Sequence, residues 1–179
     1  MVTTSPTCID TIQLLNLLIG ANGGIYVKTG GNKGGVIMNK LLLPVDGEKL
    51  SERTLDYVKE FSTSQGYEVT VLHVMAYEEA LSHPHLATVF GLHGETFEHV
   101  ANEMVAKIAQ QLKDAGIENV KTKVLKGNPA AEIVALAEGE EFRIVLMNTH
   151  GFDAAKRLMI GSVTNKVVHN CYVPVLVIQ

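Results

Sequence analysis

The chain has 179 residues, 46% of them hydrophobic, and a formal net charge of −4. This length suits one domain with a single sizeable core. The negative charge argues against an electrostatic nucleic-acid binder, which needs a basic face. No apolar run approaches the roughly 18 residues that a membrane span needs. Cys8 and Cys171 stand too far apart in the sequence for a metal or redox motif, so we expect a reducing, cytoplasmic environment.

Residues 1–37 differ in composition from the rest of the chain. An apolar patch there predicts a short helix from about Cys8 to Ile19. The first basic residue, Lys28, follows this patch, so no signal peptide is predicted. The glycine cluster at 30–35 lacks the Gly-Lys-Ser/Thr ending of a phosphate loop. We therefore expect a domain at 38–179 and a weakly tied N-terminal extension at 1–37.

From residue 38 onward, strand patterns alternate with helix patterns. A continuous apolar run predicts a strand over 41–45 that is covered on both faces. A helix over 50–64 should follow, ended by Gly66, and then a second strand over 69–74. The apolar residues that we expect on the buried stripe of this helix are Leu50, Leu55, Val58 and Phe61.

The next segment, 75–94, is expected to be a long connection, and a helix over 95–115 should follow it. The apolar residues spaced three or four apart along that helix are Phe97, Val100, Met104, Ile108 and Leu112. A third strand is predicted over 120–125. Lys121 and Lys123 fall on one of its faces, as is typical of an edge strand whose charges discourage pairing.

The last third of the chain repeats the alternation. Gly127-Asn128-Pro129 should open a helix, with Ile133, Val134 and Leu136 facing inward. The strand over 142–147 is nearly all apolar and therefore central. A helix over 162–170 and a strand over 173–178 complete the pattern, which predicts a parallel sheet wound by right-handed crossovers. Periodicity does not fix the order of the strands.

The segment from Val145 to Val168 is the candidate for function. It runs from a buried strand through a turn at Gly151 to Gly161-Ser162, which opens a helix. Backbone N–H groups and the helix dipole make such a place suitable for phosphate. Both glycines allow close approach by a ligand, and Ser162 can cap the helix or donate to a phosphate oxygen. The alternative is that these are ordinary loop and helix-start residues.

Gly151 is followed by nine residues and then Gly161-Ser162. Four further stretches accompany this spacing: Leu41-Leu42-Leu43-Pro44-Val45-Asp46-Gly47, Leu72-His73-Val74, Gly127-Asn128-Pro129 and Pro174-Val175-Leu176-Val177. In these motifs and their order, residues 38–179 resemble the universal stress protein family. Its nucleotide-binding members carry one more glycine, which Asn148 replaces here. The resemblance implies an α/β fold: a doubly wound five-stranded parallel sheet of order 3-2-1-4-5, with helices on both faces (adenine nucleotide alpha hydrolase-like).

The resemblance also implies a ligand, ATP or a related adenine nucleotide, and Mg²⁺ is expected to accompany it. The residues that would hold the adenine and ribose are Pro44, Asp46, Val74, Met147 and Asn148. Those that would hold the phosphates are Gly151, Gly161, Ser162, Val163 and Thr164. Asp46 could instead be a plain helix-entry residue.

Three departures from the family pattern bear on this site. Asn148 adds a side chain where a glycine is expected, and Glu48 stands where many relatives have serine. Asp153 would repel a triphosphate if it pointed inward, although Lys156 and Arg157 could offset it. A weakened site, a preference for a less charged nucleotide and an empty site all remain open.

Catalysis has little support. No Gly-x-Ser-x-Gly elbow is present, and His150 is better interpreted as a turn residue than as a base. We predict no catalytic residue and at most slow ATP hydrolysis. The histidines in and beside the 75–94 connection (His83, His85, His93 and His99) match no zinc pattern. That connection is expected to be a loop over part of the nucleotide crevice.

The sequence therefore predicts a cytoplasmic adenine-nucleotide-binding regulatory protein of the stress response. The resemblance implies a homodimer through the last strand, near Val175-Leu176-Val177, and an apolar edge strand needs covering in any case. No nucleic-acid or membrane partner is expected. The alternatives are a nucleotide-free dimeric interaction module and a slow ATP hydrolase.

Overall fold

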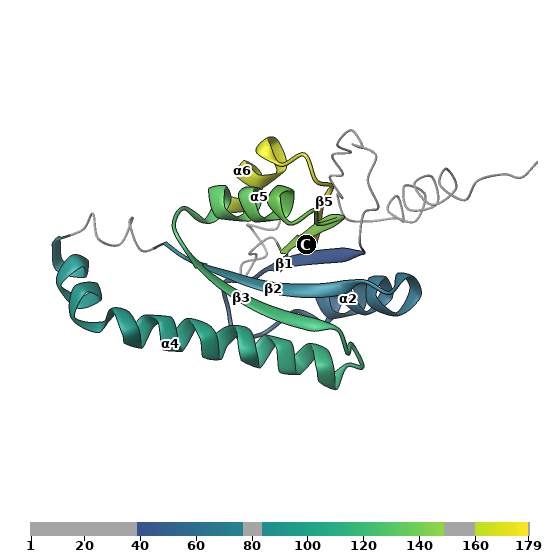
Figure 1. Cartoon of the computed structure of the whole chain (residues 1–179), viewed down its shortest axis with the longest axis horizontal. Helices are drawn as coiled ribbons and strands as arrows, with labels where there is room; N and C mark the ends of the chain where they lie inside the picture. The colour runs from purple at the N-terminus through teal and green to yellow at the C-terminus, as the bar shows by residue number, and fades with distance from the viewer. Residues whose placement is uncertain (1–38, 77–83, 149–159, 179) are drawn as a thin grey trace, which may run out of the picture.

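The computed structural model describes residues 39–76, 84–148 and 160–178, with the backbone alone for 65 and 84–96. Strands and helices alternate along these residues (Figure 1). The elements are β1 Lys40–Pro44, α2 Glu52–Gln65, β2 Glu68–Met75, α4 Pro84–Asp114, β3 Val120–Lys126, α5 Pro129–Gly139, β4 Ile144–Asn148, α6 Ser162–Asn170 and β5 Val175–Ile178. The helix predicted over 8–19 lies outside the described residues.

The strands form one five-stranded parallel sheet of order β3-β2-β1-β4-β5. Leu41 of β1 pairs with Val69 of β2 on one side and with Ile144 of β4 on the other. Figure 1 shows α4 below the sheet and α5 and α6 above it, and α2 packs into the same core as α4. The doubly wound fold and its strand order are confirmed. The winding reverses between β1 and β4, and we call the region beyond their carboxyl ends the switch point, where folds of this kind bind ligands.

Side chains alternate between two hydrophobic cores, one on each face of the sheet. Leu41, Leu43 and Leu146 pack toward α2 and α4, whereas Leu42 and Met147 pack toward α5 and α6. Because helices cover both faces, β1 and β4 are apolar at successive positions, Leu41 to Leu43 and Ile144 to Met147, as in other parallel sheets. Each fully buried leucine contributes about 1.5–3 kcal/mol relative to an exposed one.

The helix ends follow the capping residues in the sequence. The Ser51 hydroxyl accepts a hydrogen bond from Thr54 N at 3.1 Å, and α2 ends at Gly66 with φ of 66°. The Asn128 side chain caps α5 in the same way. Gly127 has φ of 148°, and a Cβ there would lie 2.7 Å from Glu132 Oε1. Only glycine fits this turn without strain.

The helix α4 differs at two points from what the sequence pattern suggests. It begins at Pro84, so part of the 75–94 connection is helical rather than loop. Proline is well suited to a first helical turn, and glycines such as Gly91 and Gly94 each cost only about 1 kcal/mol inside a helix. Val100, one of the apolar residues spaced three or four apart in the sequence, is 51% exposed. The buried stripe instead passes through Ala101 and Val105, which leaves Val100 at its margin.

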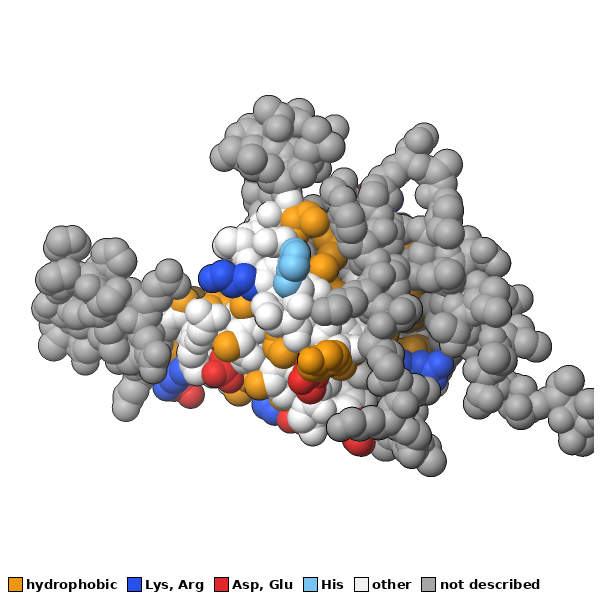
Figure 2. Space-filling view, turned by 90° about the horizontal axis from the view of Figure 1, so that it is seen from above, with side chains coloured by type: hydrophobic (Ala, Val, Ile, Leu, Met, Phe, Trp, Pro, Cys, Tyr) orange, Lys and Arg blue, Asp and Glu red, His pale blue; other side chains and the backbone are white. Residues whose placement is uncertain are grey.

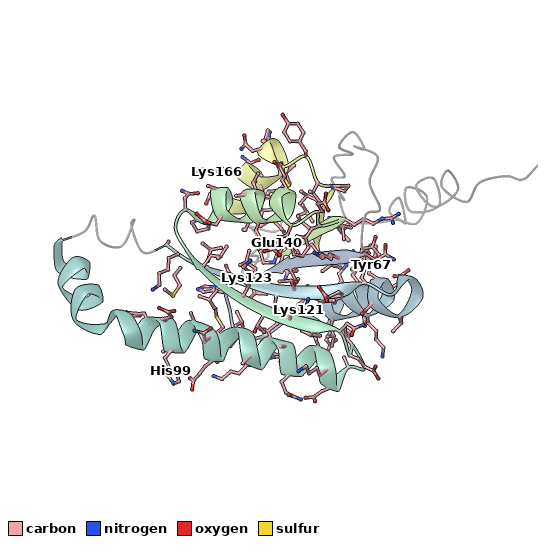
Figure 3. All side chains as sticks on the ribbon, viewed as in Figure 1. Tyr67, His99, Lys121, Lys123, Glu140 and Lys166 are labelled. Carbon is pink, nitrogen blue, oxygen red and sulfur yellow. The ribbon has the colours of Figure 1, made fainter. Side chains whose placement is uncertain are left out.

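The strand β3 lies at an edge of the sheet, as its lysines predict. Three ion pairs hold these lysines: Lys121–Glu68 at 2.9 Å, Lys123–Glu140 at 2.5 Å and Lys126–Glu98 at 2.6 Å. Figure 3 shows Lys123 and Glu140 facing each other between β3 and the end of α5. On the face seen from the side of α5 and α6, both signs of charge are scattered among hydrophobic side chains (Figure 2). Among the described residues, no helix combines the length and the apolar character of a membrane span.

Candidate functional site

Asn148, the last residue of β4, joins three elements at the switch point. Its side-chain oxygen Oδ1 accepts a hydrogen bond from Thr54 Oγ1 at 2.5 Å. Its backbone carbonyl accepts a longer one from Thr164 Oγ1 at 3.4 Å. Because Thr54 lies in the first turn of α2 and Thr164 in the first turn of α6, the starts of both helices are tied to the end of β4.

The contact with α2 belongs to a short chain of polar groups. Thr54 is completely buried, and its hydroxyl also lies 2.7 Å from the hydroxyl of Ser51. With Thr54 donating to Asn148, Ser51 is left to donate to Thr54. A buried hydroxyl without partners would cost about 1–3 kcal/mol, so this chain holds the Asn148 side chain in one orientation.

The residue after β1 is held by β2. Val45 N donates to Leu72 O at 2.8 Å, and His73 Nδ1 lies 2.9 Å from Val45 O. Because a carbonyl oxygen only accepts, His73 Nδ1 carries the proton in this contact. The next residue, Asp46, is exposed. Its position just beyond the carboxyl end of β1 is thereby fixed through the backbone of Val45.

The loop between β1 and α2 is also clamped by α4. Gln111 Nε2 donates to Glu48 O at 2.8 Å, and Gln111 Oε1 accepts from Leu50 N at 3.3 Å. The Glu48 carboxylate pairs with Lys107 at 3.1 Å. Glu48, a departure from the family pattern, thus makes contacts with α4. The Gln111 side chain thus bonds two backbone groups of this loop, the carbonyl of Glu48 and the amide of Leu50.

The predicted adenine and ribose residues lie at the ends of neighbouring strands. Pro44 is the half-buried last residue of β1, Val74 is buried near the end of β2, and Met147 is buried near the end of β4. Val74 and Met147 belong to the core below α5 and α6. Topology therefore gathers these residues, with Asp46 and Asn148, at one edge of the sheet.

The helix α6 starts beside them without a side-chain cap. Gly161 occupies its N-cap position with φ of −57° and makes no capping side-chain bond, and the first turn has no acidic residue. In contrast, α2 has Ser51 with Glu52, and α5 has Asn128 with Glu132. No carboxylate in the first turn of α6 therefore neutralises the positive end of its dipole.

Gly161 does not need glycine for its backbone conformation. Its φ is negative, and a Cβ there would meet no heavy atom of the described residues within 4 Å. Ser162 is exposed, Val163 is half-buried, and Thr164 is 4% exposed. Neither the backbone conformation nor the packing of the described residues therefore requires a glycine at this position.

Asn148 does not need a glycine-like conformation either. Glu141 is the one non-glycine residue with positive φ in the described ranges, so Asn148 adopts ordinary backbone angles. Its substitution for the family's glycine therefore leaves the strand end undistorted.

Several candidate residues lie outside the described part: Gly151, His150, Asp153, Lys156, Arg157 and His83. The side chains of His85 and His93 are not described either. His99 pairs with Glu103 at 3.3 Å on α4 and points away from the sheet (Figure 3). Within the described ranges, no three metal-ligating side chains gather into a group.

Sequence reasoning missed Thr54 and Gln111. A signal for Thr54 was available, because a polar residue stands four positions before Val58 on the stripe that faces the core. The clamp by Gln111 had no local signal, since its partners lie 61 and 63 positions away.

Comparison with known proteins gives a consistent family match. The model of the universal stress protein family matches residues 38–179. Universal stress protein MJ0577 of Methanocaldococcus jannaschii is 31% identical over 157 residues, which cover 80% of this chain and 96% of that protein. Its solved structure has a TM-score of 0.64 and 33% identity, with 80% of this chain and 96% of that chain covered.

Two more distant solved structures share the fold. One is the universal stress protein from Archaeoglobus fulgidus in complex with dAMP, with a TM-score of 0.53, 18% identity, and coverage of 80% of this chain and 100% of that one. The other is a universal stress protein in complex with cAMP, with a TM-score of 0.53, 17% identity, and coverage of 80% and 98%.

Proposed function

Because the chain belongs to the universal stress protein family, we propose that it binds an adenine nucleotide, ATP in the first place, at the switch point. The observation that carries this proposal is the start of α6. It has no capping side chain, and Thr164 joins it to the end of β4, the strand beside β1. An uncapped helix N-terminus at a topological switch point suits the phosphates of a nucleotide.

The residues that would hold this ligand form two groups, one for the phosphates and one for the nucleoside. The phosphates would lie against the backbone at Gly161, Ser162 and Val163, with Thr164 in the same turn and Gly151 contributing from the preceding loop. Open space around Gly161 supports this arrangement, because a ligand can approach its backbone. The hydroxyl of Ser162 is exposed and can donate to a phosphate oxygen.

The nucleoside would lie along the ends of β4, β1 and β2. The half-buried Pro44 and the backbone at Val74 and Met147 would line the adenine ring, and Asp46 and Asn148 offer polar groups to the ribose. Mg²⁺ bound with ATP would neutralise part of the phosphate charge while keeping several waters. We expect the phosphates, rather than a cluster of protein carboxylates, to hold the ion.

Two solved structures of the same fold add candidate ligands to ATP. Two proteins of this fold were solved with dAMP and with cAMP, so adenine monophosphates are candidates beside ATP. In this proposal the nucleotide acts as a regulatory ligand in the cytoplasmic stress response. It changes the protein only through a difference in affinity between two states. Pairing of two chains through the edge strand β5 is the expected homodimer.

Mass spectrometry of small molecules released from the purified protein on denaturation tests the proposal without choosing a ligand beforehand. The expected result is an adenine nucleotide in stoichiometric amount. After removal of any bound nucleotide, micromolar binding of ATP with Mg²⁺ is expected. Failure of the emptied protein to bind ATP, dAMP and cAMP would instead support a nucleotide-free interaction module.

A further inference from the structure

The side-chain amide of Asn148 has one end held and the other end open. Its Oδ1 atom is bound to Thr54. No residue in the described ranges accepts a hydrogen bond from its Nδ2 atom. No buried side-chain nitrogen or oxygen there lacks a partner, so Nδ2 is accessible to solvent. The amide thus presents two N–H donors at the switch point.

The hydrogen bond at Oδ1 restricts the movement of these donors. Thr54 is completely buried, and Ser51 supports its hydroxyl at 2.7 Å. Movement of the Asn148 side chain away from Thr54 would leave a buried hydroxyl with one partner fewer. A donor fixed before binding gives up little conformational entropy when a ligand arrives.

The position of Asn148 indicates which part of a nucleotide it would meet. The start of α6, where the phosphates are proposed to lie, is joined to Asn148 through Thr164. In a nucleotide the sugar is bonded directly to the first phosphate. A ligand that runs from α6 toward the ends of β4 and β1 would therefore place its sugar at Asn148. Neutral N–H donors suit the oxygen of a sugar hydroxyl.

We propose that Asn148 is a ligand-binding residue whose Nδ2 donates to a ribose hydroxyl of the bound nucleotide, and that Thr54 is the residue that positions it. This inference rests on the proposed function and deepens it, because it makes the site selective for nucleotides whose sugar carries the hydroxyl that Asn148 binds. A glycine at this position would have no such donor. An aspartate would keep the acceptor for Thr54 but present a negative charge in place of the donors.

Calorimetric titration of the full chain with Mg²⁺ and ATP, 2′-deoxy-ATP or 3′-deoxy-ATP tests this selectivity. Wild type should prefer ATP over at least one deoxy analogue by about 3- to 10-fold, the contribution of one hydrogen bond. Asn148→Gly should lower that ratio by a similar factor. Asn148→Asp should bind every analogue more weakly than wild type does.

The positioning role of Thr54 has its own readout. Thr54→Val should reduce the preference for ATP over the deoxy analogue, whereas Thr54→Ser, which retains the hydroxyl, should restore it. Thr63→Val is the matched control, because Thr63 lies in the same helix and its hydroxyl bonds to Lys59 O at an exposed site. This control should titrate as wild type does.

The outcomes separate the two claims. Absence of any nucleotide binding by wild type would remove the proposed function and this inference with it. Binding without a preference for ATP, or an unchanged preference in Asn148→Gly, would overturn the role of Asn148 alone. Equal selectivity in Thr54→Val and wild type would overturn the role of Thr54.

Discussion

Thr54 and Asn148 stand 94 positions apart in the sequence, yet their side chains form a 2.5 Å hydrogen bond at the carboxyl end of the sheet. The bond links the first turn of α2 to the last residue of β4. Because α2 follows β1 in the chain, this bond also connects the carboxyl ends of β1 and β4, the two strands at the switch point. A residue that departs from the family's glycine thus becomes a structural link.

Removal of this link should lower stability. Thr54→Val keeps the shape of the side chain but takes away the donor, so we expect a loss of about 0.5–1.5 kcal/mol in the free energy of unfolding. Urea denaturation measures it. Thr63→Val should stay within about 0.5 kcal/mol of wild type, as exposed substitutions usually do. An equal effect of the two substitutions would show that the buried bond contributes nothing of its own.

Two glycines should respond oppositely to alanine. Gly127→Ala forces a Cβ to within 2.7 Å of Glu132 Oε1 at a φ of 148°, which should cost about 1–3 kcal/mol. In Gly161→Ala the Cβ meets no atom of the described residues within 4 Å at a φ of −57°, so the unfolding free energy should change by less than about 0.5 kcal/mol. Thermal or urea unfolding of both variants checks this. A strongly destabilised Gly161→Ala would mean that the glycine serves the fold rather than a ligand.

The fold was largely predictable, for a physical reason that Leu41, Leu43 and Leu146 illustrate. Strands covered on both faces are apolar throughout, so their runs stand out in the sequence. The start of α6 at Ser162 was predictable from Gly161 before it. The order of the strands came from the family resemblance alone, because periodicity describes single elements and not which strands are neighbours.

The candidate site was predictable only in part. Sequence spacing identified Asn148 as a departure from the pattern, but it could not tell where its side chain points. The bond to Thr54 depends on a register between β4 and α2 that forms only in three dimensions. The early start of α4 at Pro84 was missed because a proline and several histidines suggest a loop over 75–94. Proline is equally suited to the first turn of a helix, and α4 begins with it.

The clamp on the loop before α2 should control local opening. In Gln111→Leu, the Leu50 amide loses its acceptor and the Glu48 carbonyl loses its donor. We expect faster hydrogen exchange at Leu50 with little change in global stability, because opening is local. Gln110→Leu is the control, since Gln110 bonds to Asp114 on the exposed side of α4. Unchanged exchange at Leu50 in Gln111→Leu would contradict the clamp.

The pair at the edge of the sheet should make a pH-dependent contribution. The hydrogen bond from Lys123 lowers the pKa of Glu140 below its ordinary value of 4.5. A lowered folded-state pKa means that the stabilisation is present above pH 4.5 and is lost as the pH falls through the folded value. Because the pair is exposed, its size should be no more than about 1 kcal/mol.

Glu140→Gln tests this when its unfolding free energy is measured at pH 7 and near pH 3. The variant should be less stable than wild type at pH 7, and the difference should shrink in acid. Lys123→Met should show the same trend, since it removes the partner. A difference that grows as the pH falls would contradict the direction of the pKa shift.

The central claim, that the start of α6 receives the phosphates of an adenine nucleotide, is tested most directly by calorimetric titration of ATP with Mg²⁺ into wild type, Gly161→Val and Gly139→Ala. Gly139 is the matched control, because it also has open space for a Cβ and ends α5 at the opposite end of the sheet. The account predicts micromolar binding by wild type and Gly139→Ala and at least about 10-fold weaker binding by a folded Gly161→Val. Equal affinity in all three proteins would contradict it.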